Sequence, residues 1–161
     1  MQSGYIGITA VPDRHARETL HGRAEPPADA DSGLGYACRD MAFTADELRL
    51  IDRTEEVEIE TTTSDGPAHR TIIWAIVDDD AVFIRSYRGP NARWYREALV
   101  NPAVALHVDG RRLAASAVPA VDPESIERAS QGFIRKYEGD PATPKMVRPE
   151  VLDLTLRLEP A

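Results

Sequence analysis

Apolar and polar residues alternate along two segments of the chain, the pattern of a β-strand with one face in a core. In residues 56–62, Val57, Ile59 and Thr61 alternate with glutamates and a threonine. In residues 152–158, four leucines alternate with polar side chains. Each segment is therefore expected to form a strand with one face in contact with solvent.

Four further strands are expected from apolar runs and turn signals. Residues 72–77 are apolar throughout, which predicts a buried central strand, and three aspartates separate them from a partner strand at 81–87. Asp109-Gly110 is a type I′ hairpin signal between strands expected at 103–108 and 111–121.

Three helices are expected from capping signals. Thr44 and Glu47 have the spacing of a capping box at the start of the first helix. Asn91 is expected to cap a short second helix whose buried side includes Leu99. Asp122-Pro123 begins a third helix, since an aspartate cap followed by proline favours a helix start.

The six strands are joined mostly by hairpins, and the helices fill the connections. This order favours a mainly β fold with helices, a closed or nearly closed six-stranded antiparallel barrel, over a βαβ sheet. A chain of 161 residues has room for one such domain, which we place at residues 43–161. Residues 1–42 lack a sustained period and are expected to form a weakly structured N-terminal arm.

Charge and composition exclude several classes of partner. The formal net charge of -8 argues against nucleic acid and against an anionic membrane surface. No run approaches the roughly 18 apolar residues of a membrane span, and the N-terminus lacks a signal-peptide pattern, so a cytoplasmic location is expected. The single cysteine, Cys38, excludes an intramolecular disulfide and a multi-cysteine metal site.

Residues 81–96 carry four arginines and no acid in a chain with 27 acidic residues. These arginines span a strand end, a glycine turn and a helix start, where backbone N–H groups and the helix dipole favour an anion. Ser86, Arg88 and Arg93 can add side-chain donors, and Gly89 allows close backbone approach. The segment from Arg85 to Arg96 is therefore the predicted anion site; the alternative is a solvated basic face that balances nearby acids.

Aromatic and imidazole side chains lie near this segment. Trp74 and Trp94 are candidates for stacking on a flat ligand, whereas Tyr95 is expected in the core. His69 is interpreted as structural or exposed and His107 as packing, and no third ligand has metal spacing, so no metal site is predicted. No nucleophile elbow, P-loop or dinucleotide fingerprint is present, so no catalytic residue is assigned and redox chemistry would need a bound cofactor.

Three segments, FTADELRLID (43–52), HRTIIWAIV (69–77) and SYRGPNARWYREAL (86–99), resemble the DUF2255 family. That family lies in the pyridoxamine-phosphate-oxidase-like, or flavin-reductase-like, split-barrel group, and the resemblance covers residues 43–160. It implies an FMN-binding type of split β-barrel, a homodimer, and FMN or the deazaflavin F420 as cofactor. By position, the resemblance implies cofactor contacts from Arg70, Thr71, Ser86, Arg88, Asn91, Arg93 and Trp94.

Two ligand-binding functions remain open from the sequence, besides a structural or interaction domain with no ligand. The first is a flavin- or deazaflavin-dependent oxidoreductase that transfers a hydride to or from a small organic substrate. The alternative is a non-catalytic protein that binds or senses a flavin, haem or a small anion in the same barrel. Both need the arginine turn and neither needs a further acid or base.

Overall fold

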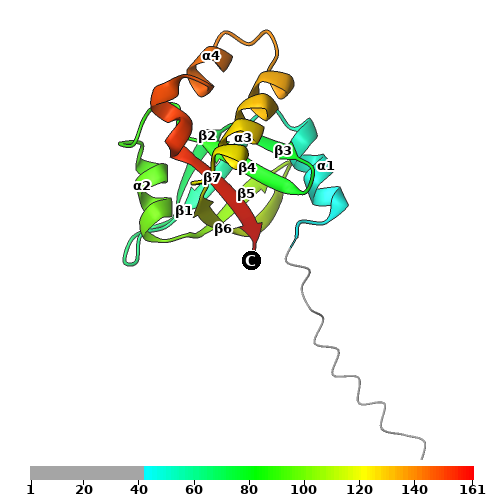
Figure 1. Cartoon of the computed structure of the whole chain (residues 1–161). Helices are drawn as coiled ribbons and strands as arrows, with labels where there is room; N and C mark the ends of the chain where they lie inside the picture. Colours follow the sequence, from blue (N-terminus) through cyan, green and yellow to red (C-terminus); the bar gives the residue numbers. More distant parts are fainter. Residues whose placement is uncertain (1–41) are drawn as a thin grey trace, which may run out of the picture. The chain divides into compact units, whose positions relative to one another are not determined.

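The computed structural model describes residues 42–161, so the predicted arm, apart from Ala42, lies outside the described residues. In chain order the elements are α1 (Ala45–Arg53), β1 (Val57–Thr61), β2 (His69–Ile73), β3 (Ala75–Asp78), β4 (Ala81–Arg85), α2 (Arg93–Val100), β5 (Ala103–Val108), β6 (Arg111–Pro119), α3 (Pro123–Lys136), α4 (Thr143–Met146), the 3-10 helix η1 (Pro149–Leu154) and β7 (Thr155–Pro160). Figure 1 shows this arrangement.

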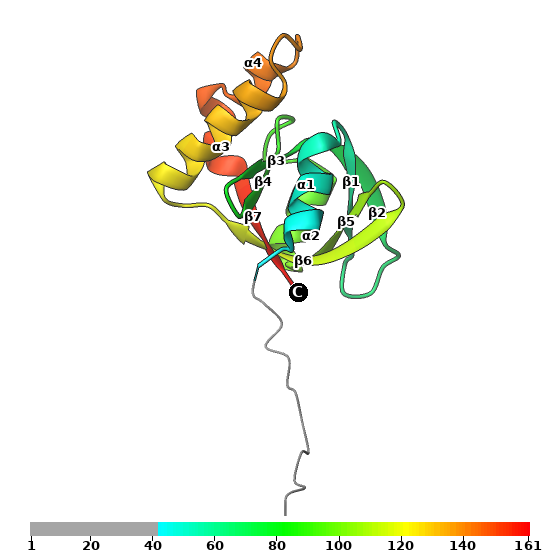
Figure 2. The same ribbon diagram turned by 90° about the vertical axis from the view of Figure 1, so that its right-hand side faces the viewer.

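All seven strands of the described chain belong to one antiparallel sheet with the order β2-β1-β5-β6-β7-β4-β3. The two ends of this sheet, β2 and β3, are separated in the chain by Trp74 alone. The sheet must therefore curl until its first and last strands meet, which gives a split β-barrel (Figures 1 and 2). The predicted fold class is confirmed.

The predicted number of strands was wrong because residues 72–77 do not form one buried strand. The chain breaks at Trp74, so that β2 pairs with β1 and β3 pairs with β4. Ile72, on the outer side of β2, is 61% exposed. An apolar run predicts burial but carries no signal for a bend. The bend at Trp74 divides one predicted strand into β2 and β3, so the sheet has seven strands instead of six.

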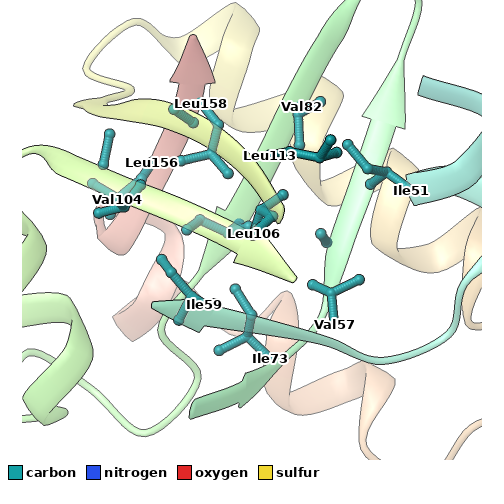
Figure 3. Packing of buried hydrophobic residues seen from close by; sticks show 14 of the residues in the cluster. Ile51, Val57, Ile59, Ile73, Val82, Val104, Leu106, Leu113, Leu156 and Leu158 are labelled. Carbon is teal, nitrogen blue, oxygen red and sulfur yellow. The ribbon is translucent and has the colours of Figure 1, made fainter. Parts of the chain in front are cut away.

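Interior side chains of the strands, together with buried residues of α1 and α2, form the main core, part of which is shown in Figure 3. Inward positions of β1 pair with inward positions of β2, such as Val57 with Ile73. Members of this cluster labelled in the figure are Ile51, Val57, Ile59, Ile73, Val82, Val104, Leu106, Leu113, Leu156 and Leu158.

A second core lies between α3 and the outer face of the sheet. It contains Ile76, Phe83, Ala129, Phe133, Tyr137 and Met146. Because α3 covers the outer face of β4, that strand is buried on both faces and shows no alternation. Gly132 of α3 permits this close approach, since a Cβ there would lie 2.5 Å from Cδ1 of Ile76.

The predicted starts of the first and third helices and the predicted β5–β6 hairpin turn are confirmed; each depends on residues close together in the chain. The capping box of Thr44 and Glu47 is present, and Asp122 accepts a hydrogen bond from the backbone of Ser125. The hairpin turn between β5 and β6 has positive φ at Asp109 (47°) and Gly110 (75°), as a type I′ turn requires.

Three local predictions were wrong. Ala92, not Asn91, caps α2, and it makes no side-chain cap hydrogen bond. Leu99 is 49% exposed because the buried side of α2 carries Trp94, Tyr95, Glu97 and Ala98 instead. The last strand begins at Thr155, because residues 149–154, which include Leu152 and Leu154, form η1.

Candidate functional site

A pocket of about 920 Å³ opens beside β2, between that strand and the end of β4 with the turn that follows it. Because β2 pairs with β1 alone, its other backbone edge has no strand partner in the sheet. Lining residues come from β2, from Trp74, from residues 85–88 and from the start of α2. The break in the barrel thus lies beside the pocket.

Seven of the eight residues predicted to bind a cofactor line this pocket. They are Arg70, Thr71, Trp74, Ser86, Arg88, Arg93 and Trp94. Asn91 is exposed in the turn and is not among the lining residues. Residues 70–74 and 86–94, which are separated in the sequence, therefore meet at one concave surface.

The turn from Ser86 to Ala92 is held by its own hydrogen bonds. The hydroxyl of Ser86 donates to the carbonyl of Gly89 at 2.7 Å, and the N–H of Gly89 donates to the carbonyl of Ser86 at 3.2 Å. Gly89 has φ of +93°, a left-handed conformation that favours glycine. Ser86 is 1% exposed, so its hydroxyl shapes the turn as well as bordering the pocket.

The start of α2 presents backbone donors. Its first intrahelical bond runs from the N–H of Arg96 to the carbonyl of Ala92. Within residues 42–161, the preceding N–H groups of Arg93 and Trp94 have no acceptor. Free N–H groups and the positive end of the helix dipole form a place where an anion can bind.

The lining arginines differ in their partners. Arg88 has no carboxylate within ion-pair distance in the described part of the chain; its Nε donates to the hydroxyl of Tyr87 at 3.0 Å. Arg93 Nε lies 4.0 Å from Glu97, and Arg70 lies 3.7 Å from Glu58. The positive charge of Arg88 is thus the most available of the three for an incoming anion.

Arg85 borders the same pocket but is part of the protein core. Its guanidinium, 2% exposed, donates to Thr155 Oγ1 (2.7 Å), Ser130 Oγ (3.1 Å) and the carbonyls of Met146 (2.7 Å) and Ile126 (3.0 Å). Burial lowers the pKa of Arg85 to about 10. Arg85 therefore joins β4 to β7, α3 and α4, whereas Arg96 is exposed and does not line the pocket.

The two tryptophans are fixed in different ways. Trp74 is half-buried and one face of its indole stacks on Tyr137, with ring centroids 3.9 Å apart. Trp94 is 6% exposed and meets Tyr95 edge to face at 5.8 Å. Tyr95, also 6% exposed, lies in the core as predicted.

Several lining residues were not predicted from the sequence. Tyr87 lies in the turn, Glu56 and Glu58 come from the β1 side, and Asp140 and Met146 come from the end of the chain that follows α3. No local motif marks Glu58, Asp140 or Met146, because Glu58 reaches the pocket through the pairing of β1 with β2, and Asp140 and Met146 reach it through the packing of α3 and α4. The pocket therefore has acidic as well as basic lining residues.

His107 does not serve only as packing. On the outer face of the sheet, its Nε2 lies 2.7 Å from Glu60, and Arg112 donates to the same carboxylate at 2.9 Å. Hydrogen bonds from Arg112 and His107 lower the pKa of Glu60. The position of His107 in a strand predicts which face of the sheet its side chain occupies, but it does not predict Glu60 of β1 as its partner.

Residues 42–161 contain no helix long and apolar enough to cross a membrane. The same residues contain no cluster of three or more His, Cys, Asp or Glu side chains that could hold a metal ion.

Comparison with known proteins gives a family and a fold. A family model described as "Uncharacterized protein conserved in bacteria (DUF2255)" matches residues 47–158. No curated protein matches the chain in sequence.

Three solved structures illustrate the similarity of fold. HutZ, the heme storage protein from Vibrio cholerae, is 14% identical, with a TM-score of 0.53 over 75% of this chain and 92% of that chain. A Listeria innocua protein described as "Putative Pyridoxamine 5'-phosphate oxidase" is 14% identical, with a TM-score of 0.51 over 72% and 90%. A protein described as F420 reductase is 20% identical, with a TM-score of 0.51 over 70% and 91%. At these identities the similarity shows the split-barrel fold alone.

Proposed function

Since this chain belongs to the DUF2255 family, we propose that it binds FMN or the deazaflavin F420 in the pocket beside β2 and acts as an oxidoreductase. Arg88, a pocket-lining guanidinium without a carboxylate partner in the described residues, is the observation that carries this proposal. The names of two fold neighbours, an F420 reductase and a pyridoxamine-phosphate oxidase, support a flavin-type ligand.

The residues present fit such a cofactor. Arg88, Arg93 and the free N–H groups of α2 would hold its phosphate, because charge-assisted hydrogen bonds and a helix start both favour that group. Arg70 and Thr71 would contact it from β2, and Trp74 would lie against its ring system. The volume of about 920 Å³ leaves room for a small substrate beside the cofactor.

In the proposed reaction the cofactor and the protein residues would have different roles. The bound cofactor would supply the hydride chemistry, and the protein would supply binding and orientation. The chain would orient the cofactor through the arginine turn, and Trp74 and Trp94 line the same pocket with aromatic surface.

We also propose that the protein acts as a homodimer. Ile72 lines the pocket and is 61% exposed on the outer face of β2, so a second copy that covered it would bury apolar surface beside the site. The native mass of the full chain, measured with and without cofactor at micromolar concentration, tests this part. A monomer with cofactor bound would contradict it.

Binding and turnover test the main proposal. The full chain is titrated separately with FMN, F420 and haem while absorbance and fluorescence are followed, and the reduced cofactor that binds is then offered small organic acceptors. We expect saturable binding of FMN or F420 and acceptor-dependent oxidation. Binding of haem alone, or flavin binding without turnover, would instead favour the non-catalytic alternative, for which HutZ is the fold neighbour.

A further inference from the structure

Glu97 is the one buried carboxylate among the described residues, with 8% of its surface exposed. Its Oε2 accepts a hydrogen bond from Thr61 Oγ1 at 2.6 Å, and its Oε1 lies 3.0 Å from His69 Nδ1. Arg93 Nε, one helical turn earlier on α2, lies 4.0 Å from the same Oε1. One side chain thus connects α2 with β1 and β2.

Burial of a carboxylate costs folding free energy unless its oxygens are hydrogen-bonded. An apolar residue at such a position would often give a fold of equal or greater stability. An ionised carboxylate only accepts hydrogen bonds, so Thr61 donates its O–H and His69 donates from Nδ1. These bonds hold the carboxylate on the side of α2 that faces β2. The placement argues for a role beyond packing.

Arg93 links this cluster to the pocket. Its side chain is 56% exposed and lines the pocket, while its Nε faces the fixed carboxylate of Glu97. The other lining arginine of the turn, Arg88, has no such neighbour in the described residues. An anion that enters the pocket must therefore compete with Glu97 for Arg93.

We propose that Glu97 is a positioning residue that acts as the internal counter-ion of the anion site. Its negative charge, 4.0 Å from Nε of Arg93, weakens the attraction of Arg93 for a phosphate group. The identity of that phosphate as part of FMN or F420 rests on the proposed function. The competition between Glu97 and a bound anion for Arg93 rests on the distance between the two side chains and on the place of Arg93 in the pocket lining.

The substitution Glu97→Gln separates charge from shape. Glutamine retains the volume and can exchange hydrogen bonds with Thr61 and His69, but it lacks the charge that competes for Arg93. We expect the affinity for FMN or F420, and for inorganic phosphate, to rise roughly two- to fivefold. A merely structural role for Glu97 would give unchanged or weaker binding and would overturn the proposal.

A double-mutant cycle tests whether the effect passes through Arg93. In an Arg93→Ala background, Glu97→Gln should no longer strengthen binding. Glu124→Gln, an exposed position on α3 outside the pocket lining, is the control for general loss of negative charge and should leave affinity unchanged. Equal gains from Glu97→Gln with and without Arg93, or from Glu124→Gln, would overturn the proposal.

Inorganic phosphate keeps this test independent of the cofactor. Phosphate titrations followed by the NMR signal of the Arg93 Nε–H group compare the native chain with Glu97→Gln. If phosphate binds and FMN and F420 do not, the proposed function fails while the phosphate comparison still decides the role of Glu97. Absence of saturable phosphate binding in both proteins would overturn the counter-ion role.

Discussion

The indole of Trp74 lies flat on the phenol ring of Tyr137, with ring centroids 3.9 Å apart and planes 5° from parallel. The hydroxyl of Tyr137 donates to the carbonyl of Glu55 at 2.6 Å and lies 3.3 Å from the carbonyl of Ala75. Tyr137, the C-cap of α3, therefore holds the break between β2 and β3 and fixes one face of Trp74. The orientation of a pocket wall depends on this contact.

Replacement of Tyr137 by phenylalanine should preserve the stack and remove its hydroxyl hydrogen bonds. We expect a loss of about 1–2 kcal/mol in the free energy of unfolding, measured in urea. Tyr137→Leu removes the ring as well and should cost about 2–4 kcal/mol. In a Trp94→Phe background, Trp74 fluorescence should shift only in the leucine variant; identical shifts in both variants would contradict a role for the stack.

Arg88 and the control Arg111 test the anion site. Arg88→Ala removes a charge-assisted hydrogen bond to the phosphate, so the affinity for FMN or F420 should fall roughly ten- to hundredfold. Stability of the protein without ligand should barely change, because within residues 42–161 the Arg88 guanidinium makes its hydrogen bond and its cation–π contact with the adjacent Tyr87 only. Arg111, exposed and 3.9 Å from Glu47, lies outside the pocket lining, and Arg111→Ala should leave affinity unchanged. Equal losses in the two variants would locate the anion elsewhere.

How far the sequence predicts the fold depends on whether the signal is local. The Thr44 capping box and the Asp109-Gly110 turn involve residues within three positions of each other, and both predictions hold. The break at Trp74 depends on contacts with the end of α3, which lies some sixty residues later in the chain and packs against β3. An apolar run is compatible with a straight buried strand and with a bent one, so the sequence pattern cannot distinguish them.

The candidate site shows the same division. Residues from Ser86 to Trp94 adjoin in the chain, so their joint position at a turn and helix start could be predicted. Asp140 and Met146 reach the pocket through tertiary packing, and Glu97 has the appearance of an ordinary helix residue until Thr61 and His69 are seen beside it. The charge and position of Arg85 predict that it belongs to the anion site, but its side chain points beneath α3 and donates to the carbonyl of Ile126.

Arg85 should behave in the opposite way to Arg88. Arg85→Met removes the guanidinium donor to the hydroxyls of Thr155 and Ser130 and to the carbonyls of Met146 and Ile126. The Ile126 carbonyl still accepts from the Ser130 hydroxyl at 2.9 Å. We expect a loss of about 2–4 kcal/mol in the free energy of unfolding, measured in urea, because four hydrogen bonds from a buried charged group are lost and the Met146 carbonyl is left without this donor. Arg88→Met serves as the matched control and should change stability by less than about 1 kcal/mol. A neutral Arg85→Met would refute the anchoring role.

Lys136 should make stability depend on pH in the alkaline range. Its Nζ is partly buried and donates to the carbonyls of Ile51 (2.9 Å) and Ala75 (2.7 Å). Burial lowers the pKa of Lys136 from its ordinary value of 10.5 to about 8, so the charged form is penalised in the folded protein. The neutral amine retains two N–H groups for the two carbonyls.

Below about pH 8 both the folded and unfolded chains hold the Lys136 proton, and the folded state carries the full burial penalty. Between about pH 8 and 10.5 the folded chain releases this proton first, so the unfolded chain binds more protons and stability rises with pH. The gain is at most about 3 kcal/mol, and less to the extent that water screens the ammonium. Lys136→Met lacks this contribution and is the matched control for all other titrating groups. Urea unfolding of both proteins from pH 7 to 10 should therefore show the native chain gaining stability relative to the variant, and parallel pH curves would show that Lys136 keeps its ordinary pKa.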